Sequence, residues 1–88
     1  MNPTALADAV AIANAASSVR IAAAALRTRF APMHVVVVDA FDMRGETPAA
    51  SGAKCHLYFG ASDGHCWAVT GDAAQAMSLF IAEHEEPQ

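Results

Sequence analysis

Hydrophobic and polar residues alternate along residues 54–61 and again along residues 65–70, which predicts two antiparallel β-strands. The Ser-Asp-Gly segment at 62–64 is typical of a three-residue hairpin loop with its glycine in the left-handed region, so Ala61 and His65 are expected to close the hairpin. This register predicts a core face with Cys55, Leu57, Phe59, Trp67 and Val69, and an outer face with His56, Tyr58, Cys66, Ala68 and Thr70.

The N-terminal third has a helical pattern. Apolar residues recur at spacings of three and four over residues 5–30, and Asn2 before Pro3 is a typical helix start. Serine and asparagine residues at 14–18 weaken the pattern, because their side chains compete for backbone hydrogen bonds. We therefore expect either one continuous helix or two helices with a break there, the second capped by a serine. Residues 1–16 then form a possible helical extension.

The rest of the chain predicts one more strand and one more helix. Four consecutive valines favour a strand over residues 33–41, and the small residues at 44–53 favour a mobile loop. Asp72 followed by Gln75 resembles a capping box, which predicts a helix from there to about Glu83. We expect the inward side of that helix to carry Ala73, Met77, Phe80 and possibly His84.

These elements predict a single small α+β domain over residues 1–88. The order α-β-β-β-α corresponds to a three-stranded antiparallel sheet with helices on one face. If the second, outer face follows the expected alternation, it is strongly apolar and needs a cover, which predicts a homodimer. The residues expected in that interface are Val35, Val37, Phe41, Tyr58 and Cys66.

Composition and charge limit the classes of molecule that the chain is expected to bind. Hydrophobic residues make up 55% of the chain and charged residues only 16%, which leaves little charged surface to keep it monomeric. The net charge of −4 gives no basic stripe for nucleic acid or for an anionic membrane surface. The alanine-rich start is interrupted by polar residues and does not resemble a signal peptide or a membrane span, so we expect a cytoplasmic protein.

Candidate chemistry is confined to the hairpin. Cys55-His56 and His65-Cys66 lack the closely spaced pairs of metal sites, and the expected register puts the two cysteines on opposite faces, too far apart for a disulfide. His65 and Cys66 are adjacent on a strand and point apart, so the histidine is poorly placed to activate the thiol. We expect no catalytic residue and no enzyme. The alternative is a metal ion, iron–sulfur cluster or haem bound by His65 and Cys66 between two chains.

Several segments resemble known families. Residues 26–38 resemble the opening of BolA-like proteins, but the residues after Gly60 do not follow their pattern. A broader match covers residues 25–83. Its motifs are the segments Leu-Arg-Thr-Arg-Phe at 26–30, Leu-Tyr at 57–58, Asp-Gly-His-Cys at 63–66 and Thr-Gly-Asp at 70–72 with Ala74 and Ala76.

By this broader match the chain resembles a small family of proteobacterial proteins without an assigned activity, often encoded near nitrogen-fixation genes. The chain departs from that family where Ala31 separates Phe30 from Pro32. The resemblance implies a bacterial accessory role in nitrogen fixation and no catalytic residue. With the residue patterns, it predicts a non-catalytic accessory or protein-interaction module.

Overall fold

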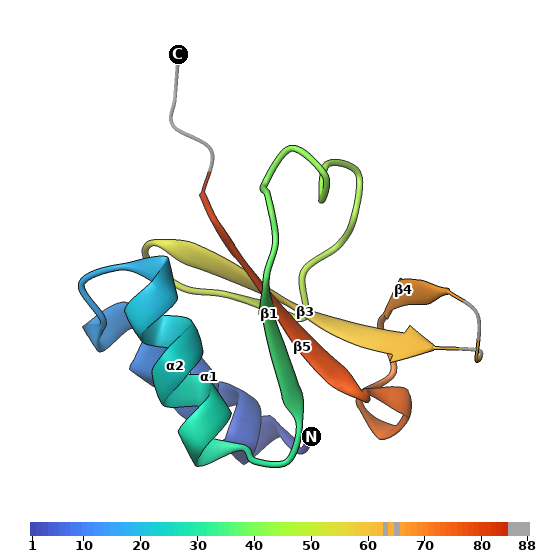
Figure 1. Cartoon of the computed structure of the whole chain (residues 1–88), viewed down its shortest axis with the longest axis horizontal. Coiled ribbons are helices and arrows are strands. Elements are labelled where there is room, and N and C mark those ends of the chain that lie inside the picture. Colours follow the sequence, from blue (N-terminus) through green and yellow to red (C-terminus); the bar gives the residue numbers. More distant parts are fainter. Residues whose placement is uncertain (63, 65, 85–88) are drawn as a thin grey trace.

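The computed structural model describes residues 1–62, 64 and 66–84. Helices α1 (Pro3–Ala15) and α2 (Val19–Arg29) come first, followed by strands β1 (His34–Val37), β2 (Ala50–Ser51), β3 (Cys55–Ser62) and β4 (Trp67–Thr70). A short 3₁₀ turn, η1 (Ala73–Gln75), leads into strand β5 (Ser78–Glu83). The α+β class is confirmed, and Figure 1 shows both helices on one side of the sheet.

Of the two arrangements expected for the N-terminal segment, the structure has two helices with a break between them. The Asn2 side chain accepts a hydrogen bond from the Ala5 N–H at 2.7 Å and caps α1, whose first residue is Pro3. The Ser18 hydroxyl accepts from the Ile21 N–H at 3.1 Å and caps α2. Both caps are local sequence signals, which is why this part of the fold could be predicted.

The sheet differs from the expected one. Its strand order is β1-β5-β3-β2, and β4 also pairs with β3. Strand β1 is parallel to β5, whereas β3 is antiparallel to β5, β2 and β4. The predicted three-stranded antiparallel sheet and the α-β-β-β-α order are therefore wrong. The predicted loop at 44–53 also contains a strand, β2.

The predicted helix over 72–83 is the main error. The Asp72 carboxylate does accept from the Ala74 N–H at 2.9 Å, but it caps only the three-residue turn η1. Residues 78–83 then form the strand between β1 and β3. A strand buried on both faces reads as a continuous apolar run, and periodicity alone does not separate it from a buried helix.

The β3–β4 hairpin is confirmed, but its register is wrong. Ser62 pairs with Trp67 and Ala61 pairs with Ala68, whereas the expected closing partner, His65, lies outside the described residues. Gly64 has the expected positive φ, at 97°. The observed pairing is displaced by an odd number of residues, so Trp67 lies on the outer face and not in the core.

The two faces of β1 are also exchanged relative to the sequence expectation, which placed Val35 and Val37 on the outer face. Val35 pairs with Leu79 on the helix side and is buried, whereas Val36 pairs with Phe80 and is exposed. The Arg27 side chain of α2 donates from Nε to the Val35 carbonyl at 2.9 Å. This contact holds β1 against α2 and occupies a carbonyl of the strand.

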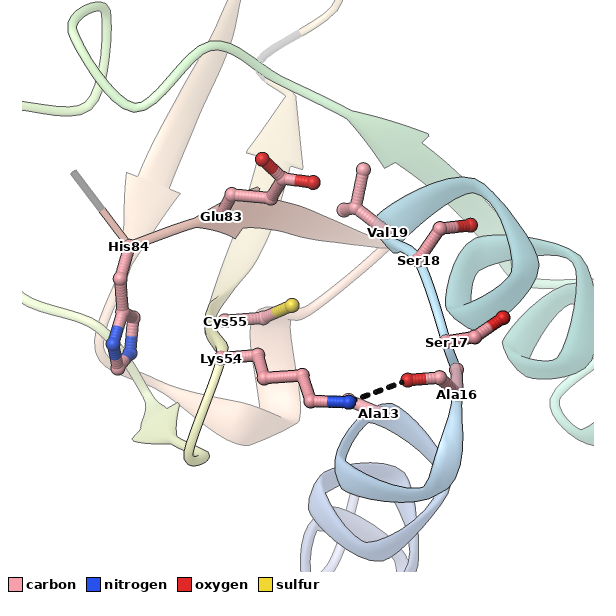
Figure 2. Close-up of a pocket in the computed structure, with 9 residues that line it drawn as sticks. All are labelled: Ala13, Ala16, Ser17, Ser18, Val19, Lys54, Cys55, Glu83 and His84. Atoms are coloured by element: carbon pink, nitrogen blue, oxygen red, sulfur yellow. Dashed lines mark hydrogen bonds between the residues drawn. The ribbon is translucent and has the colours of Figure 1, made fainter. Parts of the chain in front are cut away.

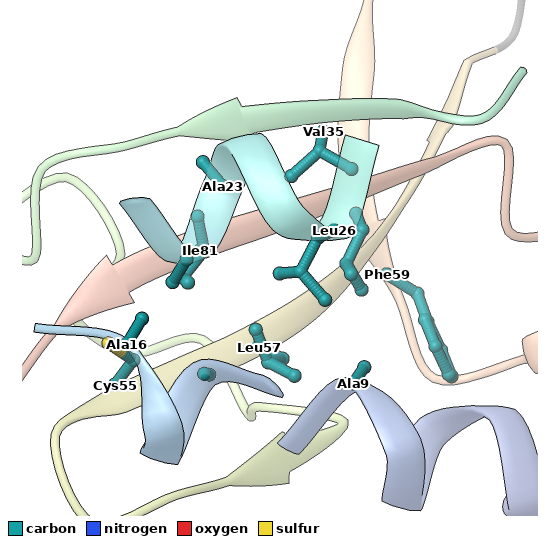
Figure 3. Close-up of a cluster of buried hydrophobic side chains, with 12 residues drawn as sticks. Ala9, Ala16, Ala23, Leu26, Val35, Cys55, Leu57, Phe59 and Ile81 are labelled. Carbon is teal, nitrogen blue, oxygen red and sulfur yellow. The ribbon is translucent and has the colours of Figure 1, made fainter. Parts of the chain in front are cut away.

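The core lies between the helices and one face of the sheet. Small side chains, Ala9 of α1 and Ala23 of α2, let the helices approach closely, while Leu26 reaches towards Leu57 and Ile81 (Figure 3). Leu26, Leu57, Leu79 and Ile81 are all fully buried. The helices therefore pack on one face of the sheet and leave the other face without a helix.

Two isoleucines provide a matched test of this arrangement. Ile81 of β5 is 0% exposed and Ile21 of α2 is 53% exposed. We expect Ile81→Ala to lower the free energy of unfolding by about 2–5 kcal/mol, because it leaves a cavity in the core. Ile21→Ala should change it by no more than about 0.5 kcal/mol. Urea denaturation measures both, and equal effects of the two substitutions would contradict the central place of β5.

Candidate functional site

The outer face is the face of the sheet opposite the helices. Residues directly paired across strands share a face, so the register assigns its members. They include His34, Val36, Ser51, His56, Tyr58, Gly60, Ser62, Trp67, Val69, Ser78, Phe80 and Ala82, with His84 on the same side directly after β5. The face divides into an apolar half near the start of β1 and a second half, with His56 and His84, near the end of β5.

The apolar half, called the aromatic patch below, consists of His34, Val36, Trp67 and Phe80 around Ser78. These residues line an open groove of about 480 Å³. Trp67 is 52% exposed and Val36 is 42% exposed. None of the five carries a permanent charge. The patch is thus an exposed surface whose contacts with a partner would be mainly apolar.

A glycine shapes the patch. A Cβ atom at Gly60 would lie 2.6 Å from the Phe80 ring, so the ring occupies the space that a side chain would need. Trp67 packs edge-on against Phe80, with ring centroids 6.4 Å apart and planes at 78°. The absent side chain of Gly60 therefore lets both aromatic rings lie across the sheet.

The other half contains the histidine pair, His56 and His84. Their ring centroids are 4.2 Å apart and the planes are tilted by 32°. His56 Nδ1 is hydrogen-bonded to Ser51 Oγ of β2 at 2.6 Å. The His84 backbone N–H donates to the Lys54 carbonyl at 2.9 Å, which holds the end of β5 beside the start of β3. The two imidazoles are thus placed by three strands.

The environment of the pair favours the uncharged ring. His84 Nε2 is buried and has no hydrogen-bond partner within the described part of the chain. Burial, and secondarily the charge of His84, lower the pKa of His56 below its ordinary value of 6.5. We therefore expect His56 to be neutral at neutral pH.

The β1–β2 loop (residues 38–49) flanks the pair. Together they line a pocket of about 460 Å³, formed by Ala40, Met43, Arg44, Gly45, Glu46, Pro48, His56, Tyr58 and His84. Tyr58 is only 4% exposed, and its pKa is raised by burial and then by the charge of Glu46. A buried phenol of this kind stays protonated at neutral pH, which makes Tyr58 a poor general base.

A second, smaller cavity of about 220 Å³ lies between the α1–α2 connection and the ends of β3 and β5. Figure 2 shows the Lys54 side chain reaching Ala16, whose carbonyl accepts from Nζ at 3.0 Å, and the Cys55 sulfur pointing into the cavity. Burial and then the charge of Glu83 raise the pKa of Cys55. This thiol is therefore in the wrong environment for a nucleophile.

The five residues expected in an interface are now dispersed. Tyr58 lies on the outer face but is buried, Val35 is in the core, and Val37 is exposed on the helix side. Phe41 is exposed in the β1–β2 loop, and Cys66 is exposed before β4. The structure therefore does not bring them together on one surface.

The residues of the alternative metal or cluster site are only partly described. His65 lies outside the described residues, whereas Cys66 is exposed. Within the described residues, no three His, Cys, Asp or Glu side chains are grouped to hold a metal ion. Cys55 and Cys66, both described, do not form a disulfide, and Cys55 is buried.

Sequence reasoning missed three residues of the outer face: Phe80, Trp67 and His84. Phe80 and His84 were expected inside a helix and Trp67 inside the core. The available signal was the run of residues 78–82, which is short for a helix and suits a buried strand. Reading it as a strand would have placed Phe80 and His84 on one face by alternation.

In comparisons with known proteins, no family model, no curated protein and no solved structure matches the chain. Among the described residues, no helix has the length and apolar character needed to cross a membrane.

The role of Gly60 can be tested against Gly71, where an added Cβ would meet nothing within 4 Å. We expect Gly60→Ala to lower the free energy of unfolding by about 1–3 kcal/mol, because the methyl group displaces the Phe80 ring. Trp67 fluorescence should shift as its contact with Phe80 is lost. Gly71→Ala should leave both readouts nearly unchanged. An unchanged spectrum and stability in Gly60→Ala would contradict the described packing.

The two cysteines should differ in reactivity. In native protein at mildly alkaline pH, iodoacetamide should modify the exposed Cys66 and spare Cys55, which is buried and has a raised pKa. Mass spectrometry of the alkylated chain measures this. Cys66→Ser protein should stay unmodified until it is unfolded with urea. Rapid native labelling of Cys55 would contradict its placement.

Proposed function

We propose that the chain is a small non-catalytic protein-interaction module that self-associates through the aromatic patch. The observation that carries this proposal is the exposure of Trp67 and Val36 beside Phe80 on a sheet face that the helices leave open. An aromatic side chain contributes a large apolar area when a partner covers it, so these positions favour association.

A second copy of the chain is the partner that we favour. The chain has a net charge of −4, so two copies repel each other weakly at most surfaces. The aromatic patch has no permanently charged side chain, and two copies can meet there without burying like charges. In a two-fold interface, Trp67 of each copy would enter the groove of the other beside Val36.

The small size of the chain also favours a dimer. With 88 residues it has only a modest core, and burial of the patch in a dimer would add to its stability. The sequence resemblance to a family encoded near nitrogen-fixation genes supplies the biological setting of the proposal. In that setting the module acts as an accessory protein, and the dimer is its binding unit.

Charge substitutions in the patch test the proposal. We expect the wild-type chain to sediment as a dimer at tens of micromolar. Trp67→Glu and Val36→Glu should each give a folded monomer, because the new carboxylate must lose its water in the interface. Sedimentation velocity measures the association and circular dichroism verifies the fold.

Ile21→Glu is the matched control, since Ile21 is as exposed as Trp67 but lies on α2. This variant should remain a dimer. A wild-type monomer, or a dimer that both patch variants leave intact, would rule out self-association through this surface. Loss of the dimer in Ile21→Glu alone would move the interface to the helices.

A further inference from the structure

The histidine pair joins three segments that are distant in the sequence. His56 of β3 contacts Ser51 of β2 through its Nδ1, and its ring stacks on His84, which follows β5. The β1–β2 loop lines the same pocket as both rings. The pair thus lies where β2, the end of β5 and the loop meet.

The geometry accommodates one proton on the pair more readily than two. Protonation of His56 can keep the contact with Ser51, because a hydroxyl oxygen accepts from an N–H as readily as it donates to a ring nitrogen. A proton on His84 Nε2 would create a buried N–H donor with no acceptor. Two charged rings with centroids 4.2 Å apart would also repel each other.

We propose that the histidine pair is a pH-sensitive latch, which holds β2 against β3 and the β1–β2 loop beside the outer face while it carries at most one proton and releases them when both rings are charged. This inference is independent of self-association through the aromatic patch. It assigns a regulatory role to the half of the outer face that the proposed dimer does not use.

Charged and titratable groups line the cavities that the histidine pair borders. Arg44 and Glu46 of the loop and Tyr58 of β3 line its pocket, and Arg20, Asp39, Lys54, Cys55 and Glu83 line the two other cavities that His84 borders. Two further acids, Glu85 and Glu86, follow His84 in the sequence but lie outside the described residues. The positive and negative charges of the described groups nearly balance. The repulsion between the two charged rings is therefore the electrostatic effect that distinguishes the doubly protonated pair.

The direction of the pH effect follows from His56. Its pKa is lowered by burial and then by His84, so the folded chain binds fewer protons than the unfolded chain near pH 6. The stabilisation that depends on uncharged His56 is fully present above the ordinary histidine value of 6.5 and is lost as the pH falls through its folded value. Acidification should therefore weaken the closed state, and the latch opens once both rings are charged.

The experiment compares wild type, His84→Phe and Ile21→Ala. Phenylalanine keeps a ring against His56 but takes no proton, and Ile21 is an exposed residue of α2, on the opposite side of the sheet from the pair. NMR titration of the imidazole signals reports protonation. Amide hydrogen exchange of residues 40–51 reports opening, compared between proteins at the same pH, above and below 6.5.

In wild type we expect His56 to titrate below 6.5 and residues 40–51 to exchange faster than in His84→Phe at acidic pH, but equally fast at neutral pH. The unfolding constant of wild type should rise with acidification, approaching about tenfold per pH unit for each extra proton that the unfolded chain binds. His84→Phe should show a smaller rise and a higher His56 titration midpoint. Ile21→Ala should behave as wild type.

Equal acid dependence of exchange in wild type and His84→Phe would overturn the latch. If His84→Phe does not fold, the wild-type titration decides alone. Two imidazoles that titrate independently at the ordinary value, with unchanged signals from the loop, contradict the proposal, whereas two separated midpoints with loop signals that follow the second support it.

Discussion

The pairing of β5 on both of its edges is the constraint on which the rest of the structure depends. The strand hydrogen-bonds in parallel to β1 and antiparallel to β3, so it joins the segment after the helices to the hairpin. Alternation along it then separates two sets of side chains. Leu79 and Ile81 enter the core, while Phe80 belongs to the outer face and His84 follows on that side.

Because both helices pack on one side of the sheet, the two ends of the outer face differ in exposure. The helices cover only the side of Leu79 and Ile81, and the β1–β2 loop lies over the end of the sheet with the histidine pair. The polar end is therefore sheltered, while the apolar end with Trp67 stays exposed. Shelter explains the lowered pKa of His56, and the exposed end is the surface through which we propose self-association.

Features with a local chemical cause could be predicted from the sequence, and features set by pairing could not. The caps at Asn2 and Ser18 depend on residues within one turn, and both were recognisable. The Asp72 side chain also forms a cap, but a cap does not determine how many helical residues follow it. The run after it was assigned to the wrong element because its partners, β1 and β3, are distant in sequence.

The candidate site depended on the same distant pairing. A displacement of an odd number of residues exchanges the two faces of a strand, and this happened in both β1 and β4. Val35, expected on the outer face, is therefore buried in the core, and Trp67, expected in the core, is exposed on the outer face. Tyr58 lies between the two halves of the outer face, paired across from Phe80 and edge-on to His56 at 6.3 Å. Because this buried ring lies between the two halves, only substitutions that leave Tyr58 intact can separate the proposed association from the proposed response to pH.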